Sequence, residues 1–242
     1  MTITPETFVA DVATAQPAAV KVFQRYNIDF CCGGQQPIRS ACESAGAPLE
    51  RVLDELQTAA TAGPGESRDW SRAPLSALAR HISQTYHEPQ AEELQRLNHM
   101  MDKVESAHGA TMPDLLQPLA QIVRGLSQEL LFHTAEEEDR LFPAIVALER
   151  REGVVLHGRA LDRFIERLQD EHVTVGRMLR QMRDVTGGFV VPSGACATFR
   201  ALYHGLEELS ASLHEHVHLE NHVLFPRAAA LGRARADAVE EV

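Results

Sequence analysis

The chain has 242 residues, and 23 Lys and Arg against 34 Asp and Glu give it a formal net charge of −11 and a pI near 5.5. This acidity argues against a nucleic-acid partner or an anionic membrane surface, since both select basic faces. No basic n-region and no run of about 18 apolar residues occurs, so the sequence predicts neither a signal peptide nor a membrane span. Few and irregularly spaced cysteines fit a reducing compartment, and we expect a cytoplasmic protein.

The first part of the chain has the signals of four short helices. Thr4-Pro5-Glu6 combines a cap, a proline and a first-turn acid, which is typical of a helix start. Pro17 opens a second segment, a third runs near 37–45 before Gly46, and a fourth covers 48–59. Together they predict a small helical unit.

Two of the four cysteines are adjacent, in the sequence NIDFCCGGQQ at 27–36. Cys31 and Cys32 are unsuited to a structural disulfide, because adjacent Cα atoms lie about 3.8 Å apart and unstrained disulfides begin at about 4.4 Å. Gly33-Gly34 supplies a backbone that can take positive φ. Two interpretations remain open: two exposed thiols on a tight turn, as candidate catalytic residues, or two small buried residues before a glycine turn.

Four longer helical runs follow a Gly/Pro/Ser-rich stretch, without an alternating strand pattern. Their approximate ranges are 73–107, 113–150, 157–185 and 195–230. Short connections between them predict an up-down-up-down four-helix bundle, and Pro89 is expected to kink the first run. The sequence therefore predicts an all-α protein with a small helical domain over 1–60, a linker over 61–72 and the bundle over 73–242.

The second and fourth runs contain the same motif. His133-x-x-x-Glu137 and His216-x-x-x-Glu220 are each followed by Leu-Phe-Pro, which begins eight residues after the histidine. A spacing of i, i+4 places the imidazole and the carboxylate on one helix face. One such pair is usually a surface contact, but two copies at one register favour a metal site.

Two further histidines are expected at the same height in the bundle, because level residues of an antiparallel hairpin are equally far from its turn. The midpoint of His87 and His133 falls at residue 110, and that of His172 and His216 falls at residue 194. Both midpoints lie in predicted connections between helices. Each long helix therefore brings one histidine to the same level.

Four imidazoles and two carboxylates suit two metal ions, each bound by two histidines and bridged by Glu137 and Glu220. Nitrogen and oxygen ligands inside a helical bundle favour iron, with manganese second. Open positions would accept an oxo or hydroxo bridge, and O2 or NO. The predicted metal ligands are His87, His133, Glu137, His172, His216 and Glu220.

The other histidines are expected outside the centre. His108 lies about 30 Å along the helix from His87 and belongs near the first interhelical loop. Surface or supporting roles are expected for the rest, namely His81, His99, His157, His204, His214, His218 and His222. Glu136, Glu138 and Asp139 are expected to form a solvated face, although one of them could orient a ligand histidine.

These residues resemble a known family. The bundle resembles a hemerythrin-like di-iron domain, and with the CCGG unit before it the chain resembles the RIC family, the iron–sulfur cluster repair di-iron proteins. The stretches that carry the resemblance are YNIDFCCGG, RDWSRAPL, TYH at 85–87, H-x-x-x-E at 133–137, DEH at 170–172 and HVHLENHVLFP at 216–226. The resemblance implies that the same six residues bind iron. It also implies a cytoplasmic stress protein that supplies iron to iron–sulfur proteins damaged by nitric oxide or oxidants.

One position departs from the O2-carrying hemerythrins, which have a second histidine one turn after the first on the third helix. Here that position is Gly176, so simple O2 carriage is less favoured. Two alternatives to repair stay open: an NO-binding or NO-reducing di-iron protein in nitrosative-stress defence, and iron or O2 binding without turnover. The thiol pair favours repair, because neither gas binding nor storage needs it. The small first unit is a candidate homodimer interface.

Overall fold

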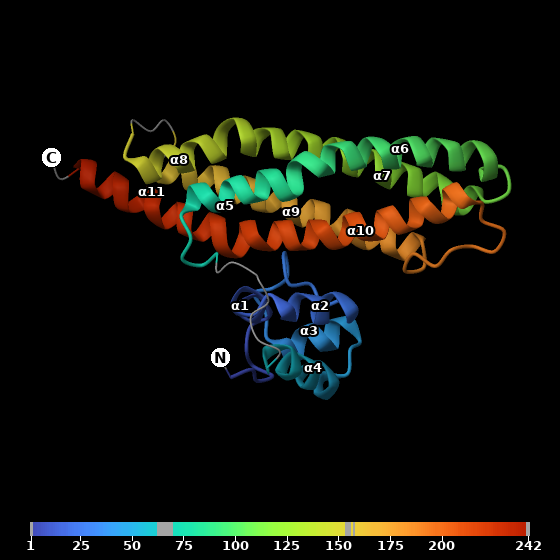
Figure 1. The fold of residues 1–242 in the computed structure, drawn as a ribbon, viewed down its shortest axis with the longest axis horizontal. Helices are drawn as coiled ribbons and strands as arrows, with labels where there is room; N and C mark the ends of the chain where they lie inside the picture. Colours follow the sequence, from blue (N-terminus) through green and yellow to red (C-terminus); the bar gives the residue numbers. More distant parts are fainter. Residues whose placement is uncertain (1, 62–69, 153–155, 157, 241–242) are drawn as a thin grey trace.

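The computed structural model describes residues 2–61, 70–152, 156 and 158–240. A long helical bundle carries a small helical unit against one side (Figure 1). In the described residues the regular structure is helical, and a single isolated antiparallel bridge joins Phe8 to Pro37. The all-α prediction is confirmed. The predicted linker falls mostly outside the described residues.

Four short helices form the small unit. They are α1 (Val9–Ala15), α2 (Ala18–Arg25), α3 (Ile38–Ala45) and α4 (Leu49–Thr61). Gly46 ends α3 with φ at 65°, a conformation that glycine adopts at no steric cost. The unit has its own apolar core, which includes the fully buried Phe23, Phe30 and Leu56.

The expected helix start at Thr4-Pro5-Glu6 is wrong. The Thr4 N–H donates to the hydroxyl of Thr7 at 2.9 Å, and α1 begins only at Val9. The segment before α1 pairs instead with the chain before α3, because the Val9 N–H donates to the Gln36 carbonyl and the Ile38 N–H donates to the Thr7 carbonyl, both at 3.0 Å. Tertiary hydrogen bonds therefore override the local helix signal.

The bundle consists of four long helices, three of which contain a short π-helical segment (η). The first comprises α5 (Leu75–Ile82), η1 (Ser83–His87) and α6 (Glu88–His108). The second comprises α7 (Pro113–Glu136), η2 (Glu137–Leu141) and α8 (Phe142–Arg150). The third is α9 (Gly158–Val185), and the fourth comprises α10 (Ala197–Leu219), η3 (Glu220–Leu224) and α11 (Phe225–Glu240). The predicted runs agree closely except at the last end, where Ala- and Arg-rich sequence continues the helix beyond residue 230.

Each π-helical segment ends two residues before a proline, at Pro89, Pro143 and Pro226. Proline has no N–H for the residue four positions earlier and its ring crowds that carbonyl, so the regular α-helical bonding pattern fails there. The π segments absorb this irregularity. The expected kink at Pro89 is therefore a change of helix type over Ser83–His87, just before α6 begins.

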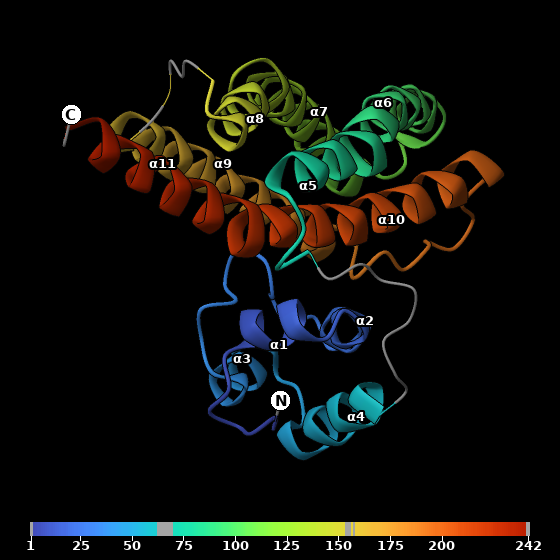
Figure 2. The same ribbon diagram turned by 60° about the vertical axis from the view of Figure 1, so that its left-hand side comes forward.

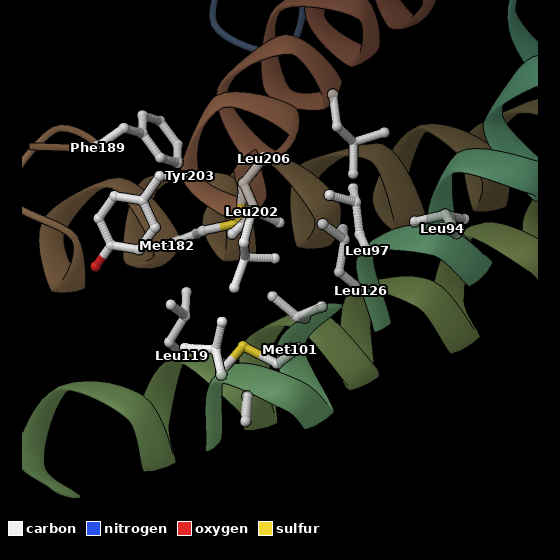
Figure 3. Close-up of a cluster of buried hydrophobic side chains, with 14 of the residues drawn as sticks. Leu94, Leu97, Met101, Leu119, Leu126, Met182, Phe189, Leu202, Tyr203 and Leu206 are labelled. Atoms are coloured by element: carbon white, nitrogen blue, oxygen red, sulfur yellow. The ribbon is translucent and has the colours of Figure 1, made fainter. Parts of the chain in front are cut away.

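Two apolar clusters fill the two ends of the bundle. One joins α6, α7, α9 and α10, and Leu97, Met101 and Leu202 point into it (Figure 3). The other joins α5, α8, α9 and α11 around Ile82, Leu168 and their neighbours. A polar layer lies between the two clusters. Among the described residues, no helix is both long and apolar enough to cross a membrane.

Candidate metal centre

Six buried polar side chains from all four long helices meet in the layer between the apolar clusters. None is more than 6% exposed, and both carboxylates are fully buried. They are the six residues that the sequence spacing predicts, namely His87, His133, Glu137, His172, His216 and Glu220. η1, η2 and η3 each carry one of them at an end, and α9 supplies His172 from its middle. Single-turn π segments are frequent at functional sites.

The six side chains form two groups that share both glutamates. One group contains His87 and His216, and the other contains His133 and His172. Within each group all the potential ligand atoms lie within 4.8 Å of one another. The Glu220 carboxylate faces both groups, because its Oε1 is 2.9 Å from His216 Nε2 and its Oε2 is 3.3 Å from His172 Nε2.

Neighbouring side chains fix the orientation of three of the four imidazoles. The Nδ1–H of His87 donates to Glu138 at 2.7 Å, and that of His133 donates to Glu171 at 2.8 Å. The Nδ1–H of His172 donates to the amide oxygen of Asn221 at 2.9 Å. Each of these bonds leaves Nε2 to point into the centre as a candidate ligand atom.

His216 is supported differently. Its Nδ1 is buried without a hydrogen-bond partner, and its ring stacks on Tyr86 with ring centres 5.4 Å apart and an interplanar angle of 13°. Burial raises the pKa of Tyr86 to about 12, so its hydroxyl stays protonated. His216 thus has an aromatic support where the other three have a hydrogen-bond acceptor.

The arrangement of the Nε2 atoms fits bound metal. His87 Nε2 and His216 Nε2 are 2.9 Å apart, and so are His133 Nε2 and His172 Nε2. Two lone pairs at this distance repel unless a proton or a metal ion lies between them. Two bonds of about 2.1 Å that meet at about a right angle would separate the nitrogens by about 3 Å. The fully buried Glu137 carboxylate has no hydrogen-bond partner on either oxygen, which suits a metal ligand.

Protons compete for the same lone pairs. Burial opposes the charge of His87, but bonds to Glu138 and Glu220 raise its pKa to about 9. Burial likewise opposes the charge of His133, and Glu137 and its other acidic neighbours raise the pKa to about 11. Burial alone would raise the pKa of Glu220, but the surrounding imidazoles hold it well below its ordinary value. Metal binding would therefore displace protons from the histidines.

The repeated Leu-Phe-Pro motif supports the centre directly. Phe142 stacks on His87 with ring centres 5.5 Å apart and an interplanar angle of 9°. Phe225 stacks on His172 at 5.7 Å and 4°. The phenylalanine of each motif therefore holds a histidine on the neighbouring helix, a role that the sequence spacing did not reveal.

The Cys31–Cys32 turn projects from the small unit and reaches the bundle close to α9 and the junction of α10 and α11 (Figure 2). Cys31 is buried and Cys32 is half-buried, and the Cys32 thiol donates to the backbone carbonyl of His172 at 3.4 Å. The thiols are covered rather than exposed. A Cβ added at Gly176 would lie 3.3 Å from the Cys32 sulfur, so the thiol occupies the room left by that glycine.

The glycines of the turn act by close approach. Neither Gly33 nor Gly34 adopts positive φ, so that part of the prediction is wrong. A Cβ at Gly34 would lie 2.6 Å from the Phe30 carbonyl oxygen and 2.8 Å from the Ala10 side chain. Asp29 completes the turn, because its Oδ1 accepts from the Cys31 and Cys32 N–H groups at 3.1 and 2.9 Å.

Three residues of the fourth long helix bind this turn, and sequence analysis missed that role. The Nδ1–H of His218 donates to the Phe30 carbonyl at 3.1 Å, and the Nε2–H of His222 donates to the Cys31 carbonyl at 2.7 Å. Asn221 donates to the same Cys31 carbonyl at 3.3 Å. The available signal was the i, i+4 spacing of His218 and His222 on a face that points away from the centre.

Of the other histidines and acidic residues considered in the sequence, only some lie near the centre. His108 ends α6 beside Phe199, with ring centres 5.5 Å apart, at the loop end where it was expected. His157 lies outside the described residues. Of the acidic residues after His133, Glu138 orients His87, whereas Glu136 pairs with Arg140 and Arg167.

Comparisons with known proteins match both parts of the chain. Residues 5–60 match ScdA_N, a domain of unknown function, and residues 79–228 match the hemerythrin HHE cation-binding domain. The chain is 38% identical to the iron–sulfur cluster repair protein ScdA of Staphylococcus haemolyticus, over 92% of this chain and 98% of the relative. It is 39% identical to the iron–sulfur cluster repair protein YtfE of Edwardsiella ictaluri, over 91% and 95%.

A second YtfE, from Pectobacterium carotovorum, is 36% identical over 91% of this chain and 95% of its own. The match to the HHE domain confirms the hemerythrin-like fold and makes the bundle a cation-binding domain. Likeness to these relatives extends over both domains. The chain belongs to the family of the iron–sulfur cluster repair proteins ScdA and YtfE.

Proposed function

We propose that the bundle holds two iron ions. His87 and His216 would bind one, His133 and His172 the other, with two carboxylates bridging them. The bridging ligands would be Glu137 and Glu220, which both groups share. The support is the pair of converging Nε2 contacts at 2.9 Å and the Glu137 carboxylate. That carboxylate accepts no hydrogen bond, and its Oε2 lies 3.5 Å from His87 Nε2 and 3.4 Å from His133 Nε2. Imidazole and carboxylate donors without thiolate favour iron over zinc in a bundle of this kind.

The residues of the chain set the properties of this centre. The apolar clusters on both sides exclude water from the ligand layer. Glu138 and Glu171 hold two imidazoles with Nε2 inward and increase their basicity. When bound, two adjacent irons supply redox chemistry, open positions for NO or O2, and a store of two transferable ions.

We further propose that the protein repairs iron–sulfur clusters damaged by nitric oxide or oxidants, in the cytoplasm, by donating iron to the damaged proteins. Its relatives ScdA and YtfE are named iron–sulfur cluster repair proteins. The contact between the Cys32 thiol and the His172 carbonyl, at 3.4 Å, carries the iron-donor part of the proposal. This contact brings a soft donor next to the backbone of His172, which we propose as an iron ligand.

The turn also offers a destination for iron. Potential ligand atoms of Asp29, Cys31 and Cys32 lie within 4.8 Å of one another. A bond to Cys32 and full burial raise the pKa of Cys31, so the docked turn keeps it as a neutral thiol. The thiol must lose its proton before it binds iron, since thiolate is the ligand form. Exposure of the turn would favour that ionisation, so we expect iron reception to accompany release of the turn from the bundle.

Iron tracing tests the proposal. The protein is loaded with ⁵⁷Fe and incubated anaerobically with an NO-damaged [4Fe–4S] dehydratase. We expect the dehydratase to regain activity and ⁵⁷Fe-labelled clusters, with matching loss of ⁵⁷Fe from this protein. Recovery of activity with unlabelled iron in the clusters would contradict donation.

One observation keeps a second function in view. All six candidate ligands are almost completely buried, so small apolar gases reach the centre more readily than a bulky client does. This favours NO binding or NO reduction at the centre. NO consumption by the protein without loss of iron would support this function over donation.

A further inference from the structure

Asn221 stands where the first half of the bundle has a carboxylate. Glu138 follows Glu137, and Asn221 follows Glu220, so the two occupy equivalent positions. Both accept a hydrogen bond from the Nδ1–H of a candidate ligand histidine, at 2.7 Å for Glu138 and 2.9 Å for Asn221. A carboxylate supports imidazole more strongly than an amide does. The amide is therefore the weaker support for the metal.

The second contact of Asn221 explains the amide. Its Nδ2–H donates to the Cys31 carbonyl at 3.3 Å, while its Oδ1 accepts from His172. A carboxylate at this position would set an acceptor oxygen against a carbonyl oxygen. Only a side chain with a donor and an acceptor serves both neighbours at once.

Docking of the turn selects the orientation of this amide. A carbonyl oxygen is only an acceptor, so Cys31 requires the NH2 end of Asn221 and leaves its oxygen for His172. That oxygen keeps the proton of His172 on Nδ1 and leaves Nε2 free to bind metal. Without the turn the amide can rotate, and its NH2 end would favour the tautomer with the proton on Nε2.

The contact between the two units is suited to opening. The apolar core of the small unit is separate from both clusters of the bundle. Polar contacts join the units: Arg180 lies 3.5 Å from Asp29, and Gln24 donates to Glu215 at 3.1 Å. A ring contact adds to them, with the ring centres of Phe30 and His218 5.6 Å apart. Polar contacts of this kind resemble those of transient interfaces.

We propose that Asn221 is a positioning residue that couples docking of the Cys31–Cys32 turn to the retention of metal by His172. The docked turn holds His172 in its metal-binding tautomer, and release of the turn loosens that ligand. This inference rests on the proposed function, because it assumes iron at His172. Coupling is reciprocal, so iron at His172 must also stabilise the docked turn.

The test measures both directions of this coupling in the full chain. Iron retention is measured by the rate of anaerobic iron transfer to ferrozine, which is slow when iron is held tightly. Docking is measured by the rate at which iodoacetamide alkylates Cys31 and Cys32, which is slow when the turn is docked. Mass spectrometry identifies the alkylated cysteine. In the wild-type protein, iron loading should slow alkylation. Asn221→Leu should lose iron about tenfold faster, at the lower end of the usual effect because an amide is the weaker support, and iron should no longer slow alkylation.

Two further variants separate the contacts. Asn221→Asp keeps an acceptor for His172 but has no donor for Cys31, so it should retain iron while its alkylation becomes fast and independent of iron. Gln24→Ala is the matched control, because it removes a contact between the units that touches no candidate ligand. Its alkylation should accelerate, yet iron should still slow it.

The proposal would be overturned if iron protected the thiols equally in the wild-type protein and in Asn221→Leu. It would also be overturned if Asn221→Leu lost iron at the wild-type rate. If Asn221→Leu fails to fold or load, Asn221→Asp decides, and protection by iron equal to that in wild type overturns the coupling. A wild-type chain that binds no iron would instead overturn the proposed function. Normal iron content with unchanged coupling in the variants overturns only the role of Asn221.

Discussion

The two faces of the candidate metal centre are supported by different chemistry. On one face, Glu138 and Glu171 accept hydrogen bonds from two of the histidines. On the other, Tyr86 stacks on a third histidine and the neutral amide of Asn221 accepts from the fourth. Tyr86 and Asn221 both line a cleft that the bundle shares with α1 of the small unit. The weaker supports therefore face the thiol-bearing unit.

This difference gives each histidine pair, a candidate metal position, one strongly and one weakly supported histidine. His87 has the carboxylate and His216 the aromatic ring in one group. His133 has the carboxylate and His172 the amide in the other. Such a centre would anchor its ions from one side and yield them toward the other, as an iron donor requires.

Both histidine groups share the two carboxylates, so removal of a carboxylate should reduce the iron content more than any other substitution. Glu220→Ala should lose most of the bound iron, because the Glu220 oxygens face both histidine pairs. The loss is measured as iron per chain after purification. His108→Ala, at the far end of α6, is the control and should keep the wild-type content. A Glu220→Ala protein with two tightly held irons would refute the ligand assignment.

The two faces should then respond unequally to mutation. Glu138→Gln and Glu171→Gln should each weaken iron binding about ten- to a hundredfold, since each replaces a carboxylate that holds a histidine. Tyr86→Phe keeps the stacked ring and should leave iron binding nearly unchanged. Competition with a graded set of chelators measures the affinities. Equal losses of iron affinity in all three variants would contradict the difference in support between the two faces.

The carboxylate-supported face also sets a pH dependence. Despite burial, neighbouring carboxylates raise the pKa of His87 to about 9, above its ordinary 6.5. Because the pKa of His87 is higher in the folded than in the unfolded state, protonation of His87 stabilises the metal-free fold. This contribution to the free energy of unfolding is complete below pH 6.5 and is lost as the pH rises through 9. Iron bound at His87 would displace these protons, so the gap in Tm between loaded and metal-free protein should widen from pH 7 to pH 9.

Thermal melts of both forms at several pH values measure that gap. Calorimetry in two buffers with different ionisation enthalpies provides an independent check, because iron binding at neutral pH should release protons. Glu138→Gln should reduce the release by removing a carboxylate that raises the pKa of His87. A gap that narrows toward pH 9 would contradict the assigned proton competition.

The thiols on the weaker face should have the smallest effect on iron content. A Cys31→Ser/Cys32→Ser variant should keep its iron and helix content, because neither thiol belongs to the two histidine groups. It should nevertheless repair NO-damaged clusters more slowly in the anaerobic assay. Cys42→Ser, in the core of the small unit, is the control. Unchanged repair would leave the turn with a structural role alone.

The sequence predicted the level of the centre because long antiparallel helices translate sequence spacing into height. The midpoints of the histidine pairs fall in short connections, so His87, His133, His172 and His216 had to lie level. The π-helical segments were not predicted, because a 3.6-residue period does not reveal a local change of helix type. The recurring prolines two residues after each segment were the signal.

Contacts between the two units could not be predicted from the sequence pattern. Asn221 and Cys31 are far apart in the chain, and no periodicity connects them. The burial of Cys31 likewise depends on the bundle surface rather than on its own segment. The sequence offers Glu136, Glu138 and Asp139 as acids that could orient a histidine. The choice of Glu138 depends on the position of His87 on another helix.

Two metal ions are expected in the shared layer, one beside each histidine pair. Diffraction data from crystals of the iron-loaded protein, collected on both sides of the iron absorption edge, test this expectation most directly. We expect two anomalous peaks, one at His87 and His216 and one at His133 and His172, with both shared glutamates in contact. A single peak, or iron only beside Cys31 and Cys32, would contradict the account.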